Sequence, residues 1–437
     1  MMTMSIQNCC CFLAVLQSTR LDSGQPLTTD VMDKTQLVTE ATFPLQYIEK
    51  LLQDCLKTSA VFANASSERI GEGAGMTSRI VKLKIDWSQK EDSLPTSFIL
   101  KLPSTKNIKD ASATFGSDEH SKKFSESLAS DGERLIRMMH NSESAVYRYG
   151  QQLAGSEVLR LAKCFYIEEI VAGKTQGLLV LEDLSEMEGK PCGPVGPVGV
   201  EVILQFAEFI ADVQAFGERH PQLREENRLV STIPDIFGTE TVFAGYFKNG
   251  LDAMKQKWPT YFGDLPDKAL EICPDIEAYR RLYHGYEELN TAPVLVHGDL
   301  FIGNTISRQV EGSEKINIAA VIDWQVTHFG SPAEDLARIV ASSLSTKVRR
   351  AQTSAILKHF YSCLSKKLAP KPVPYSFEQL RQSFKWALTF GTMTMAGGMP
   401  VYLQSDRWTE EAREELLDRL KCLLEDVIDI HAGKEPD

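Results

Sequence analysis

PVLVHGDLFIGNTISRQ (residues 293–309) and INIAAVIDWQVTHFGSPAEDLAR (residues 316–338) are the two segments that decide the fold of this chain. Each contains a short apolar run typical of a buried strand, and an acidic residue follows each run, Asp299 in the first segment and Asp323 in the second. Reactive side chains are commonly presented where a rigid strand gives way to a loop. We therefore expect residues 293–338 to form a catalytic and metal-binding core.

The spacing within HGDLFIGN, residues 297–304, indicates phosphoryl transfer. Asn304 follows Asp299 by five positions, as in the protein-kinase catalytic-loop pattern H-R-D-L-x-x-x-N. Transfer to a hydroxyl needs a carboxylate near the acceptor and a divalent metal on the phosphate oxygens. Asp299 would act as the base, and the oxygens of Asn304 and Asp323 suit Mg²⁺. Glycosidases also use two carboxylates, but their chemistry explains neither the asparagine nor an upstream lysine.

The composition is that of an ordinary globular protein. The chain has 437 residues, of which 43% are hydrophobic and 24% charged, enough for one two-lobed enzyme or for two or three domains. The net charge of −12 argues against a nucleic-acid partner, because little basic excess is present to neutralise phosphates.

The nine cysteines are scattered without any C-x-x-C pair, a pattern typical of reduced thiols in a cytoplasmic protein. Cys9, Cys10 and Cys11 open the run CCCFLAVL, which could belong to a signal peptide or a lipidated segment. No Lys or Arg precedes it, so we expect residues 1–40 to be a disordered extension. No other apolar run approaches the ~18 residues of a membrane span, and no membrane partner is expected.

Two features of the first half point to a phosphate site. Gly71, Gly73 and Gly75, in a turn between two expected strands, would let backbone amides approach phosphate oxygens, although glycines in hairpin turns are common. Lys101 lies in the apolar strand SFILKLP, residues 97–103. It either meets an anionic partner in the interior or points to solvent from an edge strand, and the sequence leaves both readings open.

A helix is expected over residues 131–153, after a polar insertion at 104–131 that is expected to be mobile or partly helical. Its Glu143 is a solvated helical charge unless it pairs with Lys101. Two further strands lead to PCGPVGPVG, residues 191–199, which is typical of a linker. We divide the chain into the extension 1–40, an N-terminal nucleotide-binding lobe 41–186, a linker 187–200 and a C-terminal catalytic and substrate-binding lobe 201–437.

Helical periodicity supplies most of the remaining elements. The first expected helix spans residues 44–56, and the clearest one spans 201–216 with Gly217 as its stop. Later helices are expected at 274–289, 347–366, 376–394 and 409–432. The Met-Gly-Gly stretch at 394–408 is expected to interrupt the last pair and to border a substrate pocket, for which Trp258, Tyr402 and Trp408 are candidate aromatic residues.

HGDLFIGN, VIDWQ and SPAEDLAR together resemble the aminoglycoside phosphotransferase and choline kinase superfamily, and most of all its CHK-kinase-like, ecdysteroid-kinase-like group. The resemblance covers residues 45–430 in order and spacing. It implies an α+β, two-lobed protein-kinase-like fold, with an antiparallel sheet in a small N-terminal lobe and a larger, mostly helical C-terminal lobe. It also implies ATP and Mg²⁺ as cofactors and a small-molecule hydroxyl as the acceptor.

The resemblance assigns roles to individual residues. Asp299 falls on the catalytic base, and Asn304 and Asp323 fall on the Mg²⁺ ligands. Lys101 and Glu143 fall on the phosphate-orienting ion pair, since HNSESAVY is similar to the family's H-N-x-E-x-x-x-Y. The remaining assignments are His297 and Asp335 as supports of the catalytic loop, and residues 181–184, with Glu182 and Leu184, as the backbone contacts to adenine.

Departures from the family pattern bear on the substrate. Choline kinases carry an asparagine where Gly298 stands and a tyrosine where Trp324 stands, which argues against choline as the acceptor. The resemblance to the ecdysteroid-kinase-like group implies a steroid-like or other lipophilic alcohol instead. A catalytically silent nucleotide-binding scaffold is the alternative. Protein kinase activity ranks third, because only eleven residues separate Asp323 from Asp335, too few for a long activation segment.

Overall fold

The computed structural model describes residues 33–39, 41, 43–70, 77–89, 93–104, 119–171, 176–186, 197–226, 229, 247–309, 316–403 and 408–434. Several residues discussed above therefore lie outside the described part of the chain: residues 1–32, Gly71, Gly73 and Gly75, linker residues 187–196, and the side chain of Tyr402. Residues 33–39 belong to the N-terminal lobe, because Val38 is buried in its core and Leu37 pairs with Pro44.

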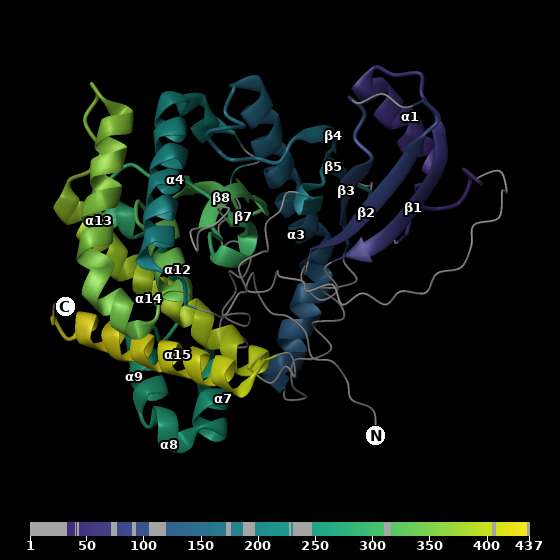
Figure 1. The fold of residues 1–437 in the computed structure, drawn as a ribbon. Helices are drawn as coiled ribbons and strands as arrows, with labels where there is room; N and C mark the ends of the chain where they lie inside the picture. Colours follow the sequence, from purple (N-terminus) through teal and green to yellow (C-terminus); the bar gives the residue numbers. More distant parts are fainter. Residues whose placement is uncertain are drawn as a thin grey trace.

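The N-terminal lobe is a five-stranded antiparallel sheet with the strand order β1-β2-β3-β5-β4 (Figure 1). Helix α1 (Leu45–Leu56) confirms the first expected helix and buries Ile48 and Leu52 in the same core as Val81, Leu83 and Phe98 of the sheet. Alternate residues of β2 and β3 face this core, as the period of two in a strand requires. The strands are β1 (Phe62–Ile70), β2 (Ser78–Trp87), β3 (Ser97–Pro103), β4 (Cys164–Glu168) and β5 (Leu178–Glu182).

Helix α3 (Glu119–Gln152) lies between the two lobes and is longer than expected (Figure 1). It begins twelve residues before Asp131, so the end of the polar insertion is helical, which is one of the two expectations for that stretch. Glu, Lys, Ala and Leu in residues 119–130 are good helix formers, so their polarity did not indicate a loop. Leu135, Ile136 and Met139 join the core of the larger lobe, whereas Tyr147 packs with β5.

The C-terminal lobe is mostly helical, and helix α4 (Val200–Arg219) crosses its core. The expected stop at Gly217 is wrong, because α4 continues through it. A Cβ atom at Gly217 would lie 2.6 Å from Cβ of Leu295, so this glycine serves a close helix–strand approach rather than a helix end.

The Met-Gly-Gly stretch does not interrupt the last helices as far as Tyr402, because α14 (Phe377–Tyr402) runs through it. A Cβ atom at Gly250 of α7 (Asn249–Lys257) would lie 2.5 Å from Cα of Gly397. Small residues let the two helix backbones approach closely at this point. The glycines that resembled a helix break are therefore a helix-packing contact.

The other expected helices are confirmed with small shifts at their ends. The expected helix at 274–289 is divided in two, since His284 separates α10 from α11. The remaining helices of the lobe are α8 (Pro259–Phe262), α9 (Leu265–Ile272), α10 (Ile276–Tyr283), α11 (Gly285–Glu288), α12 (Glu334–Ser343), α13 (Thr346–Leu368) and α15 (Glu410–His431).

The two decisive segments form two small antiparallel pairs in the C-terminal lobe. β6 (Val294–Val296) pairs with β9 (His328–Gly330), and β7 (Thr305–Gln309) pairs with β8 (Ile316–Val321). Asp299 and Asp323 follow β6 and β8, as expected. Both residues therefore leave short, buried strands at the base of the same lobe.

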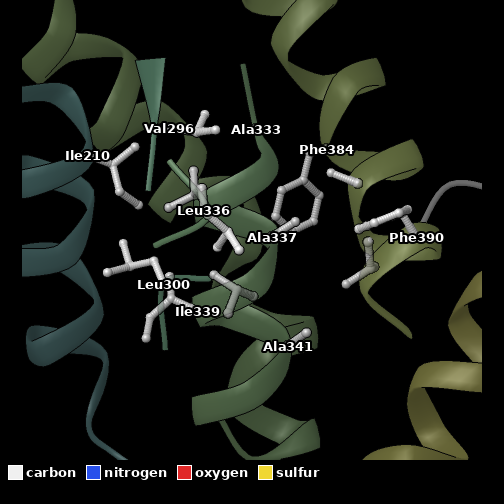
Figure 2. Close-up of a cluster of buried hydrophobic side chains, with 14 of the residues drawn as sticks. Ile210, Val296, Leu300, Ala333, Leu336, Ala337, Ile339, Ala341, Phe384 and Phe390 are labelled. Atoms are coloured by element: carbon white, nitrogen blue, oxygen red, sulfur yellow. The ribbon is translucent and has the colours of Figure 1, made fainter. Parts of the chain in front are cut away.

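Helix α12 supports these strands from below. Figure 2 shows Leu336, Ala337 and Ile339 of α12 between Ile210 of α4 on one side and Phe384 of α14 (Phe377–Tyr402) on the other. Leu336 is fully buried there, so α12 has little freedom to rotate. Helix α12, which begins at Glu334, is thus packed on two opposite faces. Its position relative to the HGDLFIGN loop is therefore fixed.

The predicted α+β, two-lobed fold is confirmed, with the antiparallel sheet in the smaller lobe and the helices mainly in the larger one (Figure 1). Among the described residues, no helix combines the length and the apolar character needed to cross a bilayer.

Replacing Leu336 with Ala is expected to lower the free energy of unfolding by about 2–5 kcal/mol, because a cavity opens between α4, α12 and α14. The urea midpoint followed by tryptophan fluorescence measures the loss. Leu37→Ala, at a side chain that is 56% exposed, is the control and should change stability by less than about 0.5 kcal/mol. Equal effects of the two substitutions would contradict the central position of α12.

Candidate active site

Lys101 lies where the two lobes meet. Its strand, β3, runs between β2 and β5, so the edge-strand reading of this lysine is wrong. The Nζ atom lies 2.5 Å from Oε2 of Glu143 on α3 and 2.7 Å from Oδ1 of Asp323. Burial would lower the pKa of the Lys101 ammonium, but the two carboxylates outweigh it and raise that pKa above its usual range. Lys101 is therefore a charged group that links both lobes.

The H-N part of HNSESAVY fixes the helix that carries Glu143. The Asn141 side chain donates to the carbonyl oxygen of Ile170 at 3.0 Å and accepts from the Ile170 N–H at 2.9 Å. Burial lowers the pKa of His140 to about 4, so the imidazole is neutral at pH 7, and its Nε2 lies 2.7 Å from the Glu168 carbonyl. These contacts attach α3 to the end of β4. Glu143 itself is buried rather than a solvated helical charge.

Asp335 holds the catalytic loop through its backbone. Its two carboxylate oxygens accept the N–H groups of His297 at 2.8 Å and Gly298 at 3.0 Å. Gly298 has φ +85°, and a Cβ atom there would lie 2.4 Å from the Val326 carbonyl oxygen. The loop thus requires glycine at this position for both conformation and space. An asparagine, as in choline kinases, would not fit here without a shift of the chain.

His297 joins the two decisive segments. Its Nδ1 accepts the Asp299 N–H at 3.2 Å, so the Nε2–H donates to the Ile322 carbonyl at 3.0 Å. The Ile322 N–H donates in turn to the Asn304 carbonyl at 2.9 Å. Burial lowers the pKa of the His297 imidazole to about 4, which keeps the neutral form that this network needs. Both the N–H and the carbonyl of Ile322 are therefore hydrogen-bonded, which fixes the backbone immediately before Asp323.

Asp299 is oriented by two side chains. Arg338 of α12 lies 2.8 Å from its Oδ1, and the Asn304 amide nitrogen donates to its Oδ2 at 3.1 Å and to its backbone carbonyl at 3.0 Å. The amide oxygen of Asn304 then faces away from Asp299.

Asp323 adopts a conformation that non-glycine residues rarely take, with φ +66°. Such a conformation costs of order 1–3 kcal/mol and persists only when the surroundings determine it. Besides Lys101, its carboxylate contacts the Gln325 amide at 3.2 Å, and Gln325 accepts the Thr77 hydroxyl at 2.6 Å. The side chain of Asp323 is therefore linked by two routes to the N-terminal lobe.

The donors fit a magnesium ion. Asp323 supplies a carboxylate and Asn304 an amide oxygen, the hard ligands that Mg²⁺ prefers. The backbone hydrogen bond from Ile322 to Asn304 brings Asp323, the next residue in the chain, close to Asn304. The nearby ammonium of Lys101 would bind phosphate oxygens rather than the metal.

The predicted adenine segment lies at the junction of the lobes. Glu182 ends β5, and Leu184 packs against Ile306 of β7 and Ala320 of β8 in the other lobe. Between them, burial alone would raise the pKa of Asp183, but hydrogen bonds from Lys82, Ser185 and Ser97 outweigh it and hold that pKa at about 2. Asp183 therefore anchors the junction to β2 and β3.

The candidate acceptor residues in the described region are packed against the core. Trp258 lies 6.3 Å, centroid to centroid, from Phe262, and Trp408 packs at the edge of the same lobe. Neither residue is brought to Asp299 by a described contact.

Sequence reasoning did not single out three contributors to the site: Arg338, Gln325 and Thr77. Arg338 had a usable signal, because it follows Asp335 by three positions on one helix and so faces the same loop. Thr77 and Gln325 lie 248 residues apart, and only the fold brings them together.

A family model described as "Uncharacterized oxidoreductase dhs-27" (DUF1679) matches residues 34–435. The Caenorhabditis elegans protein of that name is 23% identical over 324 residues, covering 71% of this chain and 36% of that protein. "Uncharacterized kinase-like protein D1044.1" from the same organism is 29% identical over 116 residues, 26% of this chain and 29% of that protein. The matched segment thus spans about a third of the length of these curated relatives.

Among solved structures, a choline kinase from Cryptosporidium parvum Iowa II aligns with a TM-score of 0.45 at 13% identity, over 89% of this chain and 98% of that chain. A putative aminoglycoside phosphotransferase from Ralstonia eutropha aligns with a TM-score of 0.43 at 11% identity, over 87% and 98%.

The buried His297 predicts acid sensitivity. Below pH 6.5 the unfolded imidazole binds a proton that the folded one does not bind until about pH 4, so stability is lost as the pH falls through this window. His297 contributes up to about 1.4 kcal/mol per pH unit to the slope. His297→Gln cannot titrate and should reduce that slope, measured from urea midpoints at several pH values. Identical slopes for the two proteins would show that His297 titrates normally when folded.

Proposed function

We propose that this chain, which belongs to the family described as "Uncharacterized oxidoreductase dhs-27", is an ATP-dependent small-molecule kinase that transfers the γ-phosphate to a hydroxyl. The observation that carries the proposal is the position of Lys101 between Glu143 and Asp323, one residue from each lobe, with Asp299 held nearby in the catalytic loop. A lysine oriented by a glutamate, a metal-binding aspartate and a separate aspartate base are the groups that phosphoryl transfer uses.

The name of the family and of one relative refers to oxidoreductase activity, but the match covers only 36% of that relative. The proposal follows the groups around Lys101 rather than this name. The proposal is supported by the chemistry of these groups. Lys101 supplies an ammonium that pairs with Asp323, and Asp299 is a second carboxylate that contacts Arg338 and the Asn304 amide. The second relative, whose name describes it as kinase-like, agrees with this assignment.

In the proposed reaction the nucleotide binds between the lobes, with its adenine against backbone groups of residues 181–184. The Lys101 ammonium keeps its contact with Glu143 and exchanges Asp323 for phosphate oxygens. Asp323 and Asn304 would hold Mg²⁺, which would supply positive charge to neutralise the phosphates. Gly71, Gly73 and Gly75 are assigned to the phosphates on the basis of their sequence pattern.

Asp299 is the proposed base. Its carboxylate accepts the proton of the acceptor hydroxyl while Arg338 and Asn304 keep both of its oxygens in place. Because catalysis of this kind depends strongly on positioning, loss of the Arg338 contact should also slow the reaction, although less than loss of the carboxylate itself.

The acceptor class is carried forward from the motif resemblance: a steroid-like or other lipophilic alcohol. A cytoplasmic location is proposed with it, supported by the thiols that the structure describes, Cys55, Cys164, Cys273, Cys363 and Cys422, all of which are free.

Replacing Asp299 with Ala should lower Mg²⁺-dependent phosphorylation by about 100-fold or more, because the acceptor proton loses its base. Purified protein is incubated with labelled ATP and a panel of hydroxylated steroids, amino alcohols and glycosides, and product formation is measured. Asp252→Ala, on the surface of α7, is the matched control and should retain full activity.

Unimpaired turnover in the Asp299→Ala protein would refute the base assignment. Absence of turnover in the unmodified chain, with intact binding of Mg²⁺ and ATP, would instead favour the catalytically silent scaffold.

Arg338→Ala should reduce kcat by about 10- to 100-fold with little change in the KM for ATP, since Asp299 loses an ion pair that orients it. Arg338→Lys should recover part of the loss. Arg280→Ala, which removes an exposed helical ion pair with Glu277, is the control. An unchanged kcat in the Arg338→Ala protein would mean that Asn304 alone is sufficient to position Asp299.

A further inference from the structure

A second group of metal-binding side chains lies in the C-terminal lobe, between α4 and α13. Glu208 of α4 and His359 and Cys363 of α13 bring one oxygen, one nitrogen and one sulfur atom within 4.8 Å of one another. His359 Nε2 lies 3.2 Å from Glu208 Oε1 and 3.5 Å from Cys363 Sγ. None of the three residues takes part in the site around Asp299.

The backbone under this group is rigid. His359 and Cys363 are one turn apart on α13, so their side chains project from the same face. The residues that follow them, Phe360 and Leu364, are buried in the core, which fixes the rotation of the helix. One turn further, Lys367 lies 2.6 Å from Asp212 of α4 and fixes the register of the two helices. Figure 1 shows α4 and α13 packed side by side.

The two separations from His359 Nε2 match those around a tetrahedral zinc ion, and all three donor atoms lie within 4.8 Å of one another. With Zn–N and Zn–O bonds of about 2.0–2.1 Å and a Zn–S bond of about 2.3 Å, tetrahedral angles set N and O roughly 3.3 Å apart and N and S roughly 3.6 Å apart. The observed separations at His359 Nε2 are 3.2 Å and 3.5 Å. Both agree with the tetrahedral values to about 0.1 Å.

The same nitrogen cannot serve both neighbours well through hydrogen bonds. With a hydrogen on Nε2, His359 donates to the Glu208 carboxylate, and the nitrogen has no lone pair to accept the Cys363 thiol. Without that hydrogen, Nε2 can accept a hydrogen bond from the Cys363 thiol. Its lone pair then also faces the Glu208 carboxylate oxygen, which is unfavourable. A cation at the centre would satisfy all three donors at once.

We propose that Glu208, His359 and Cys363 bind a zinc ion that joins α4 to α13, with water in the fourth position. A thiolate and an imidazole favour zinc over magnesium, whereas the oxygen donors Asn304 and Asp323 favour magnesium. The chain would thus hold two different cations at separate places. When the sulfur–zinc bond forms, the thiol proton is released to solvent.

The test is a Co²⁺ titration of the metal-free full chain, because a thiolate ligand gives Co²⁺ a charge-transfer band in the near ultraviolet. Cys9, Cys10 and Cys11 are replaced by Ser in every sample, since adjacent thiols could bind the same ion. The band should saturate at one Co²⁺ per chain and disappear on addition of Zn²⁺. Cys363→Ser and His359→Gln should abolish it, whereas Cys422→Ser, which removes a thiol from α15, should leave it unchanged.

The affinity for Zn²⁺, measured by competition with a chromophoric chelator, should fall by at least about 100-fold in the Cys363→Ser protein. The far-ultraviolet circular dichroism of each variant confirms that it is folded. The absence of a band in the parent protein, or a band that survives Cys363→Ser, would overturn the proposal. In that case Glu208 and His359 form only an interhelical ion pair.

Discussion

The structure depends on one buried ammonium. Lys101 carries its charge into the interface of two lobes, and such a charge is tolerated only with close anionic partners. Glu143 and Asp323 provide them from α3 and from the second decisive segment. The three residues are far apart in the chain, so their contacts tie the sheet, helix α3 and the larger lobe to one another.

The rest of the site is built mainly from backbone hydrogen bonds. Asp335 holds two successive N–H groups, and His297 connects Asp299 to the residue before Asp323. These contacts join residues of the larger lobe to one another, so movement of the smaller lobe leaves them in place. The side chains that do the proposed chemistry are consequently held by the larger lobe, while Lys101 is brought to them by the smaller one.

Much of this arrangement could be predicted from sequence because it depends on short spacings. The five-residue step from Asp299 to Asn304 and the apolar runs before Asp299 and Asp323 are local, and the structure keeps them. The pairing of Lys101 with Glu143 came from the motif resemblance, since periodicity alone left it open. The errors came from glycines and polar residues whose role is set by distant neighbours. Gly217 and Gly397 resembled helix breaks because their close contacts, Leu295 and Gly250, are remote in sequence.

The strand order of the smaller lobe has a mechanical consequence. Helix α3 shares its core with the larger lobe and is also tied to the end of β4 through Asn141. A rocking motion of the sheet would therefore pivot at its β4 edge. With strands about 4.8 Å apart, β3 lies some 10 Å from that pivot and β1 some 19 Å. The lever arm is longest at the edge formed by β1 and β2. The hydrogen bond from Thr77 to Gln325 acts near that far edge, where a weak contact exerts the greatest torque on the lobe.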